Sequence, residues 1–143
     1  MTRIGHRMMQ VEAALLLVAA HVAVHTLPFR LTARAMGRQY REAPPASHPD
    51  APAIAQRVGQ AVEQIALRLP MAPQCLAQTI AARQMLRRRG IDCTIYLGLR
   101  RMGAPVDLPV SQRPIAAHAW LNVSGVTVVG GDSSNCSTVN WFG

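Results

Sequence analysis

The chain has 143 residues, which is the length of a single domain with one hydrophobic core and leaves no room for a second enzyme. Half of the residues are hydrophobic but only 4% are aromatic, so the core must be built from Ala, Leu, Val and Met. The formal net charge is +8, yet the arginines are scattered, match no nucleic-acid-binding motif and have few aromatic neighbours for base stacking, so we expect no nucleic-acid partner.

An apolar run over residues 11–24 predicts a helix near the N-terminus. The run is shorter than the ~20 apolar residues that span a bilayer and is interrupted by polar side chains. We interpret it as a buried or partner-facing helix. Peripheral membrane contact is the alternative, because a basic, Leu-rich N-terminus could lie on anionic lipid. Pro28 ends this helix, and residues 31–36 predict a second, short helix that Gly37 stops.

Four prolines within residues 43–52 exclude both a helix and a central strand there, so this stretch is predicted to be a linker. It divides the chain into an N-terminal helical hairpin with its linker, residues 1–52, and a part that carries the chemistry, residues 53–143. We expect the two parts to form one compact unit.

Two further helices are predicted after the linker. From Ala53 onward apolar residues recur every three or four positions until Pro70. The next amphipathic pattern begins at Cys75, just after Pro73, and stops at Gly90. Cys75 therefore lies at a helix N-terminus, where the partial positive charge of unpaired amides favours thiolate over thiol. A lone cysteine on a helix is more often a small core residue, so a second observation is needed.

The remaining patterns predict short strands at residues 93–99, 117–123 and 126–129, with a turn at Ser124-Gly125. Helices followed by consecutive strands, without alternation of the two, predict an α+β fold in which helices pack on a small antiparallel sheet of three or more strands.

The second observation is a histidine and a carboxylate that follow the cysteine in the chain. His118 lies on the second predicted strand, and Asp132 is the only Asp or Glu after it. Cys75, His118 and Asp132 are the parts of an acyl-transfer site.

Three cysteines in total are an odd number without zinc-site spacing, so neither a disulfide framework nor a metal site is expected, and a reducing, cytoplasmic location fits best. Cys93 lies in a β-rich run and is expected in the core. Cys136 lies among Ser and Asn and is expected in a loop.

Five segments, in a fixed order, carry a family likeness: Leu27-Pro28-Phe29-Arg30, Cys75-Leu76, Leu86-Arg87-Arg88-Arg89-Gly90-Ile91, Tyr96-Leu97-Gly98 and Ala117-His118-Ala119-Trp120. Over residues 10–131 the chain resembles the transglutaminase-like leader peptidase of lasso-peptide biosynthesis, which has a papain-like cysteine peptidase core. The resemblance implies a cysteine endopeptidase that cuts the leader from a ribosomally made precursor through a thioester acyl-enzyme, with no cofactor.

The resemblance also implies partners. Many members of this family carry an additional leader-recognition domain, for which this chain has no room. It would therefore be a split enzyme that takes the precursor leader peptide from a stand-alone leader-recognition protein and works beside an ATP-dependent macrolactam cyclase. We expect the apolar N-terminal hairpin, with its arginines, to be the docking surface. The alternative is that Leu15–Val24 simply caps the core.

By the same resemblance, Cys75 is the nucleophile and His118 the general base and then acid. The family's Asp commonly falls about twelve positions after the histidine, which is Gly130 here, so Asp132 is taken as the third residue. A regular hairpin would place Gly131 opposite His118, whereas a β-bulge would pair Asp132 with it. We expect the bulge.

The backbone amide of Cys75 is the expected oxyanion donor, and Gln74 is the candidate for a second donor. Trp120 lies on the same strand face as His118, where it either shields the site from water or is plain core. A different class of function stays open at this point: a non-catalytic peptide-binding or membrane-associated scaffold of the same fold.

Overall fold

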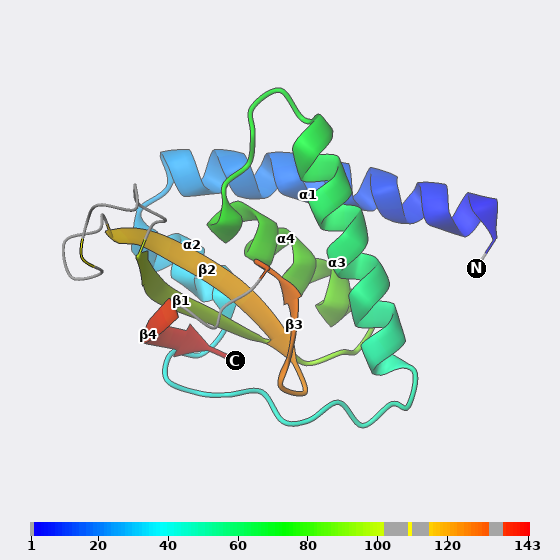
Figure 1. Ribbon diagram of the computed structural model, residues 1–143. Helices are drawn as coiled ribbons and strands as arrows, with labels where there is room; N and C mark the ends of the chain where they lie inside the picture. The colour runs from blue at the N-terminus through cyan, green and yellow to red at the C-terminus, as the bar shows by residue number, and fades with distance from the viewer. Residues whose placement is uncertain (1, 102–108, 110–114, 132–135) are drawn as a thin grey trace.

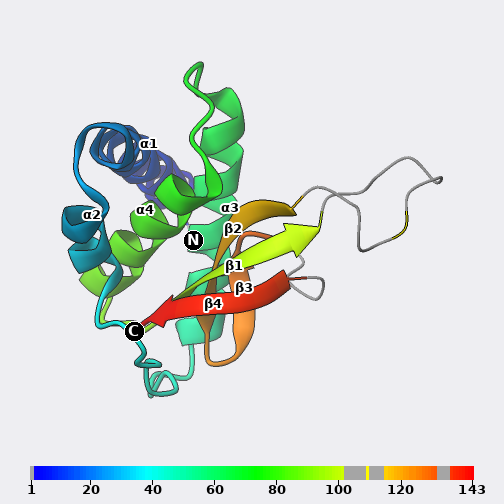
Figure 2. The same ribbon diagram turned by 90° about the vertical axis from the view of Figure 1, so that its left-hand side faces the viewer.

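A computed structural model describes residues 2–101, 109, 115–131 and 136–143. Within these residues the helices precede the strands, as predicted. The helices are α1 (Arg3–Thr26), α2 (Phe29–Met36), α3 (Ala51–Arg68) and α4 (Cys75–Arg88), and the strands are β1 (Thr94–Arg101), β2 (Ile115–Val123), β3 (Val126–Val129) and β4 (Cys136–Phe142). The helices cover one face of the sheet, so the predicted α+β fold is confirmed (Figures 1 and 2).

Most helix ends lie close to the predicted positions, but α1 begins at Arg3, eight residues before the apolar run that predicted it. Gly37, with φ +115°, ends α2, and a Cβ there would come within 2.5 Å of the Gly143 carbonyl oxygen. Helix α3 begins at Ala51, so the prediction that residues 43–52 contain no helix is wrong for the last two of them. Pro52 lies in the first turn, where the missing amide hydrogen costs no intrahelical bond.

Strands pair antiparallel in the order β3-β2-β1-β4. The predicted loop at Cys136 is wrong, because this residue begins β4, which pairs with β1. Sequence patterning missed β4 because much of it is polar. This edge strand is held by backbone hydrogen bonds and by Phe142, which is buried in the core.

The predicted β-bulge is present between β2 and β3. Val123 pairs with Val126 across the two-residue turn, but Leu121 pairs with Val129, so Val128 is the extra residue. Strand β3 ends at Val129, and Gly130 and Gly131 follow with φ of +103° and +66°. Asp132 itself lies outside the described residues.

Helix α1 has one buried and one exposed face. Its buried residues Met9, Ala13, Leu17 and Ala20 join the core formed with α3, α4 and the sheet. In Figure 2, α1 and α2 lie on the side of α4 that faces away from the sheet. The helix is long and apolar enough to cross a membrane by length and composition, a test that core helices also pass.

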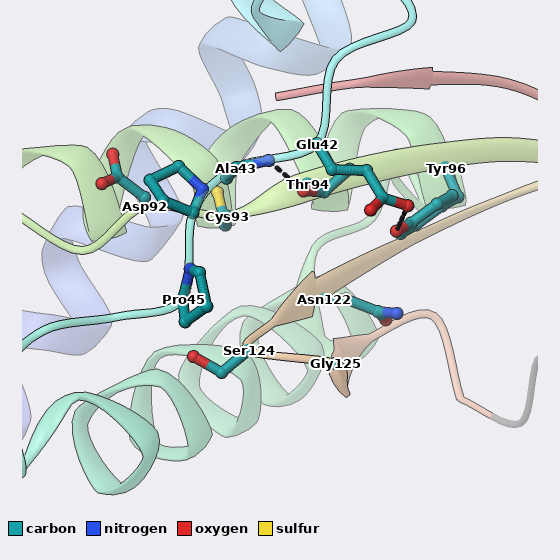
Figure 3. Close-up of a pocket in the computed structure, with 11 residues that line it drawn as sticks. Glu42, Ala43, Pro45, Asp92, Cys93, Thr94, Tyr96, Asn122, Ser124 and Gly125 are labelled. Carbon is teal, nitrogen blue, oxygen red and sulfur yellow. Dashed lines mark hydrogen bonds between the residues drawn. The ribbon is translucent and has the colours of Figure 1, made fainter.

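The linker runs across the ends of the strands and is tied to them. The backbone amide of Ala43 donates to Thr94 Oγ1 at 2.9 Å, and that of Ala46 donates to Ser124 Oγ at 2.9 Å. Figure 3 shows the pocket of about 250 Å³ that forms there, with Glu42 pointing at the hydroxyl of Tyr96, which donates to it at 2.9 Å.

Candidate active site

Cys75 is the first residue of α4 and is half-buried. Gln74 precedes it in an extended conformation and makes no side-chain cap. The side chain of Gln78, one turn along, donates through Nε2 to the Pro73 carbonyl oxygen at 2.9 Å and so ties down the turn before the helix. The first-turn amides of a helix have no intrahelical acceptors, and Gln74 supplies none from its side chain. An anion beside Cys75 would therefore meet unused backbone donors.

A pocket of about 540 Å³ opens at this helix end, and both Cys75 and His118 line it. Helix α4 supplies the cysteine and strand β2 supplies the histidine, so the tertiary fold brings together two residues that lie 43 positions apart. The other walls come from α3, from the turn before α4 and from the sheet: Glu63, Ala66, Leu67, Ala72, Pro73, Gln78, Arg100, Gly130 and Gly131.

His118 is oriented by a backbone carbonyl. Its Nε2 lies 2.7 Å from the carbonyl oxygen of Gly130. A carbonyl oxygen can only accept a hydrogen bond, so Nε2 must carry the proton. In the neutral ring this leaves Nδ1 with its lone pair as the nitrogen able to accept a proton from a thiol.

Only glycine fits at position 130. Its φ is +103°, and a Cβ there would lie 2.6 Å from the Cβ of Trp120 and 2.7 Å from the Ala119 carbonyl oxygen. This is the position at which the resembled family commonly has its Asp. Here the backbone of that residue, instead of a side chain, holds the histidine.

Three rings stack behind the site in the order Tyr96, Trp120, His118. The Tyr96 and Trp120 centroids are 5.6 Å apart at 14°, and the Trp120 and His118 centroids are 5.9 Å apart at 20°. Trp120 is buried, and the lack of a side chain at Gly98 makes room for it, since a Cβ there would lie 2.9 Å from the indole. Trp120 is therefore a buried residue that packs against the ring of His118, and its shielding of the site from water stays a prediction.

Tyr96 connects this stack to the linker. Burial, followed by the hydrogen bond to Glu42 and the charge of that carboxylate, raises the pKa of Tyr96 to about 12. The phenol thus stays protonated and keeps donating to Glu42 at any physiological pH.

The sequence did not single out three of the polar residues in this pocket: Gln78, Glu63 and Arg100. The spacing of Gln78, three residues after Cys75 on one helix, was a usable signal; Glu63 and Arg100 come from other elements and gave none. Gln74 is exposed and is not among the described residues that line the pocket, so its role as a second oxyanion donor stays a prediction.

Cys93 is in the core, as predicted, and its pKa is raised to about 11 by burial, although the nearby Arg83 opposes that shift. Among the described residues no group of three His, Cys, Asp or Glu side chains is placed to hold a metal ion.

A family model described as the transglutaminase-like superfamily matches residues 14–140. The chain belongs to the transglutaminase-like superfamily. Members of this superfamily generally include cysteine peptidases, in agreement with a cysteine and a histidine that share one pocket. The match begins inside α1 and ends inside β4, so the second half of α1 is part of the transglutaminase-like fold. No curated protein and no solved structure matches this transglutaminase-like chain significantly.

Proposed function

We propose that this transglutaminase-like chain is a cysteine endopeptidase that removes the leader from a lasso-peptide precursor. One observation carries the catalytic part of the proposal. Cys75 and His118 line the same pocket, and the bond from His118 Nε2 to Gly130 leaves Nδ1 as the proton acceptor. The substrate assignment rests on the resemblance of the five sequence segments.

The proposed reaction has two halves. His118 Nδ1 takes the proton of the Cys75 thiol, and Sγ attacks the scissile carbonyl carbon. The imidazolium then gives its proton to the leaving amine, which is the new N-terminus of the core peptide. Next, His118 takes a proton from water, the hydroxide attacks the thioester, and the sulfur leaves, so that the leader departs with a new carboxylate.

The backbone amide of Cys75 is the proposed first oxyanion donor, since it lies in the uncapped first turn of α4. Gln74 is the sequence-based candidate for the second. Gln78 is the alternative that the pocket supports, because its side chain lines the pocket and is already held by Pro73. Comparing turnover of Gln74→Ala and Gln78→Ala distinguishes the two candidates.

Asp132 is the proposed third residue. The sequence supports it, because Asp132 is the only Asp or Glu after His118, and the β-bulge on which its choice depended is present at Val128. Because Gly130 already fixes the tautomer of the histidine, the proposed role of the carboxylate is to stabilise the imidazolium charge.

The proposed partners are the precursor leader peptide, a stand-alone leader-recognition protein that delivers it, and the ATP-dependent macrolactam cyclase, all in the cytoplasm. Leu17 is fully buried, so the docking surface proposed for the hairpin falls better on α2. There Phe29 and Leu31, with Leu27 just before the helix, are exposed beside Arg30 and Arg34. Apolar side chains beside cations suit a partner that offers an apolar surface with acidic residues.

Two measurements test the proposal. Iodoacetamide at pH 6 should label Cys75 ahead of Cys136 and well ahead of the buried Cys93, and His118→Ala should abolish that preference. A precursor peptide encoded beside the chain should be cut by the wild type together with the leader-recognition protein, and not by Cys75→Ala.

The rival class of function is a non-catalytic scaffold that binds peptide or lies at a membrane. Equally slow labelling of all three thiols, with no cleavage, would favour the scaffold. Full cleavage without a second protein would refute the split-enzyme part of the proposal while leaving the peptidase intact. Phe29→Ser should weaken only the cleavage that depends on the second protein.

A further inference from the structure

Helix α1 exposes a straight apolar stripe that the core does not use. We call it the outer seam, and its six side chains are between 38% and 71% exposed: Ile4, Met8, Val11, Leu15, Val18 and Val22. Their spacing alternates between four and three residues, which is the heptad spacing of helices that pack against other helices. The seam extends over about 27 Å of helix and lies opposite the buried face of α1.

The two halves of the outer seam differ in shape. The N-terminal half borders an apolar hollow of about 540 Å³, lined by Ile4, Arg7, Met8, Val11, Glu12, Leu15 and Arg88. The C-terminal half presents Val18 and Val22 as exposed side chains, and neither lines that hollow. One half therefore borders a recess, and the other half presents exposed valine side chains.

We propose that the outer seam binds the outer seam of a second copy of this chain, with the two helices antiparallel across a two-fold axis. In that arrangement Ile4 meets Val22 of the second copy, Met8 meets Val18, and Val11 meets Leu15. Each hollow then faces Val18 and Val22 of the second copy, so the same surface lies on both sides, as a two-fold interface requires.

The residues beside the seam allow close approach. Gly5, Ala14 and Ala19 flank it with small or no side chains, which leaves room for a second helix, while Arg7 and Glu12 also border the seam. Arg7 falls opposite Ala19 of the second copy, and Arg3 falls near the C-terminal end of the other α1. A cation is favourable at the C-terminal end of a helix. Parallel pairing would instead crowd the arginines at the N-terminal end of both copies.

The distribution of charge favours a second copy over other occupants. From Ala13 to Thr26, α1 carries no Asp, Glu, Lys or Arg, and Glu12 is already paired with Arg89 at 2.7 Å. On α1 itself, the cations that an anionic membrane surface or an acidic partner helix would meet are Arg3 and Arg7, which lie near one end of the seam, as does Arg88 of α4. The apolar C-terminal half matches the uncharged surface that an identical helix supplies.

Pairing through the outer seam leaves the pocket of Cys75 open, since none of the described residues that line that pocket belongs to α1. The dimer proposal therefore stands or falls independently of the peptidase proposal.

The test is sedimentation velocity of the full chain over roughly 1–100 μM, the range in which a modest interface dissociates. We expect a concentration-dependent monomer–dimer equilibrium. Leu15→Glu, at the centre of the seam, should raise the dissociation constant by at least about 100-fold, because it places two charges in the interface. Val139→Glu, an apolar position on β4 that is 59% exposed against 68% for Leu15, is the matched control and should leave the equilibrium unchanged. Circular dichroism checks that both variants are folded.

Disulfide trapping tests the direction of the helices. A mixture of Met8→Cys chains with Val18→Cys chains should cross-link between the two variants, whereas Met8→Cys alone should not. Cross-linking of Met8→Cys with itself would overturn the antiparallel arrangement. A wild type that stays monomeric throughout, or a Leu15→Glu variant that dimerises as well as wild type, would overturn the proposal. So would a monomer whose seam instead binds vesicles containing phosphatidylglycerol.

Discussion

At the scale of single residues, the feature that sets this site apart is a histidine held by a main-chain carbonyl. The Gly130 oxygen accepts from His118 Nε2 and so fixes both the tautomer and the ring plane. A carbonyl has a dipole but no net charge, so it stabilises an imidazolium less than a carboxylate would. If Asp132 stabilises the imidazolium as proposed, the site separates two tasks that one Asp performs in many acyl-transfer triads: orientation of the ring and stabilisation of its charge.

Replacing Gly130 tests the orienting role. Gly130→Ala must place a Cβ against the backbone of Trp120, at a φ that side chains rarely adopt. The carbonyl then moves, and turnover should fall at least about 10-fold with a smaller change in KM, because the base is misplaced while binding survives. Gly125→Ala is the control, since its φ is +81° but nothing lies within 4 Å of the new Cβ. Equal turnover in the two variants would show that the carbonyl does not matter.

Asp132→Asn tests the charge-stabilising role. With the tautomer already fixed by Gly130, the loss should be about 10–100-fold in turnover, well short of the ~10⁴-fold seen where an Asp also sets the tautomer. His118→Ala should be more damaging than Asp132→Asn. Steady-state cleavage with matched thermal melts separates a catalytic loss from unfolding. Wild-type turnover in Asp132→Asn would mean that Cys75 and His118 work as a dyad with the carbonyl alone.

At the scale of elements, the β-bulge packs closely against helix α3. The extra residue, Val128, lies against Gly59, where a Cβ would come within 2.3 Å of the Val128 carbonyl oxygen. Glycine is unfavourable inside a helix, and its presence here is explained by this close approach. The contact links α3 to the strand end from which Gly130 reaches His118.

Gly59→Ala should therefore destabilise the fold, although alanine normally improves a helix by about 1 kcal/mol. The clashing atom belongs to the backbone and cannot rotate away, so overpacking should cost about 1–3 kcal/mol and outweigh the gain. Urea unfolding measures the difference in the free energy of unfolding. Gln60→Ala, at the next and exposed position, is the control and should change it by less than about 0.5 kcal/mol. A Gly59→Ala variant at least as stable as wild type would show that the sheet yields without cost.

At the scale of the whole molecule, the charge has an unusual composition, because all 15 cationic side chains are arginine and none is lysine. Arginine stays charged above pH 12, so between pH 9 and 11 the side chains that titrate are cysteines and tyrosines. The change in the free energy of unfolding above pH 9 should consequently depend on the titration of few groups. Of these, Cys93 is the one buried in the core, with its pKa raised from 9.0 to about 11.

The sign of that shift predicts alkaline destabilisation. The folded state keeps the Cys93 proton to a higher pH than the unfolded chain does, so this stabilisation is complete below pH 9 and is lost as the pH rises through 11. The loss amounts to about 3 kcal/mol at most. In urea unfolding at pH 8 to 11, Cys93→Ala should show a flatter decline than wild type. Cys75→Ala is the control, and identical slopes in Cys93→Ala and wild type would contradict the prediction.

The sequence by itself determined the local structure of this protein. Pro28, Gly37 and Gly90 ended helices for steric reasons that act within a few residues. The alternation of side chains in β1 and β2 predicted strands, and the position of Cys75 at a helix start followed from its neighbours. Short segments of the sequence also indicated the superfamily, and the match over residues 14–140 confirmed it.

Only the tertiary structure decided how the pieces meet. Polar β4 gains its stability from pairing with β1, which no local pattern encodes. Helix α1 has two apolar stripes, and α3 and α4 cover only one of them. That packing decided which side of α1 belongs to the core and which to the surface. The group that orients His118 is a backbone oxygen, and every residue has one. Its selection came from the bulge, the left-handed φ of Gly130 and the packing of Trp120, which are properties of the folded chain.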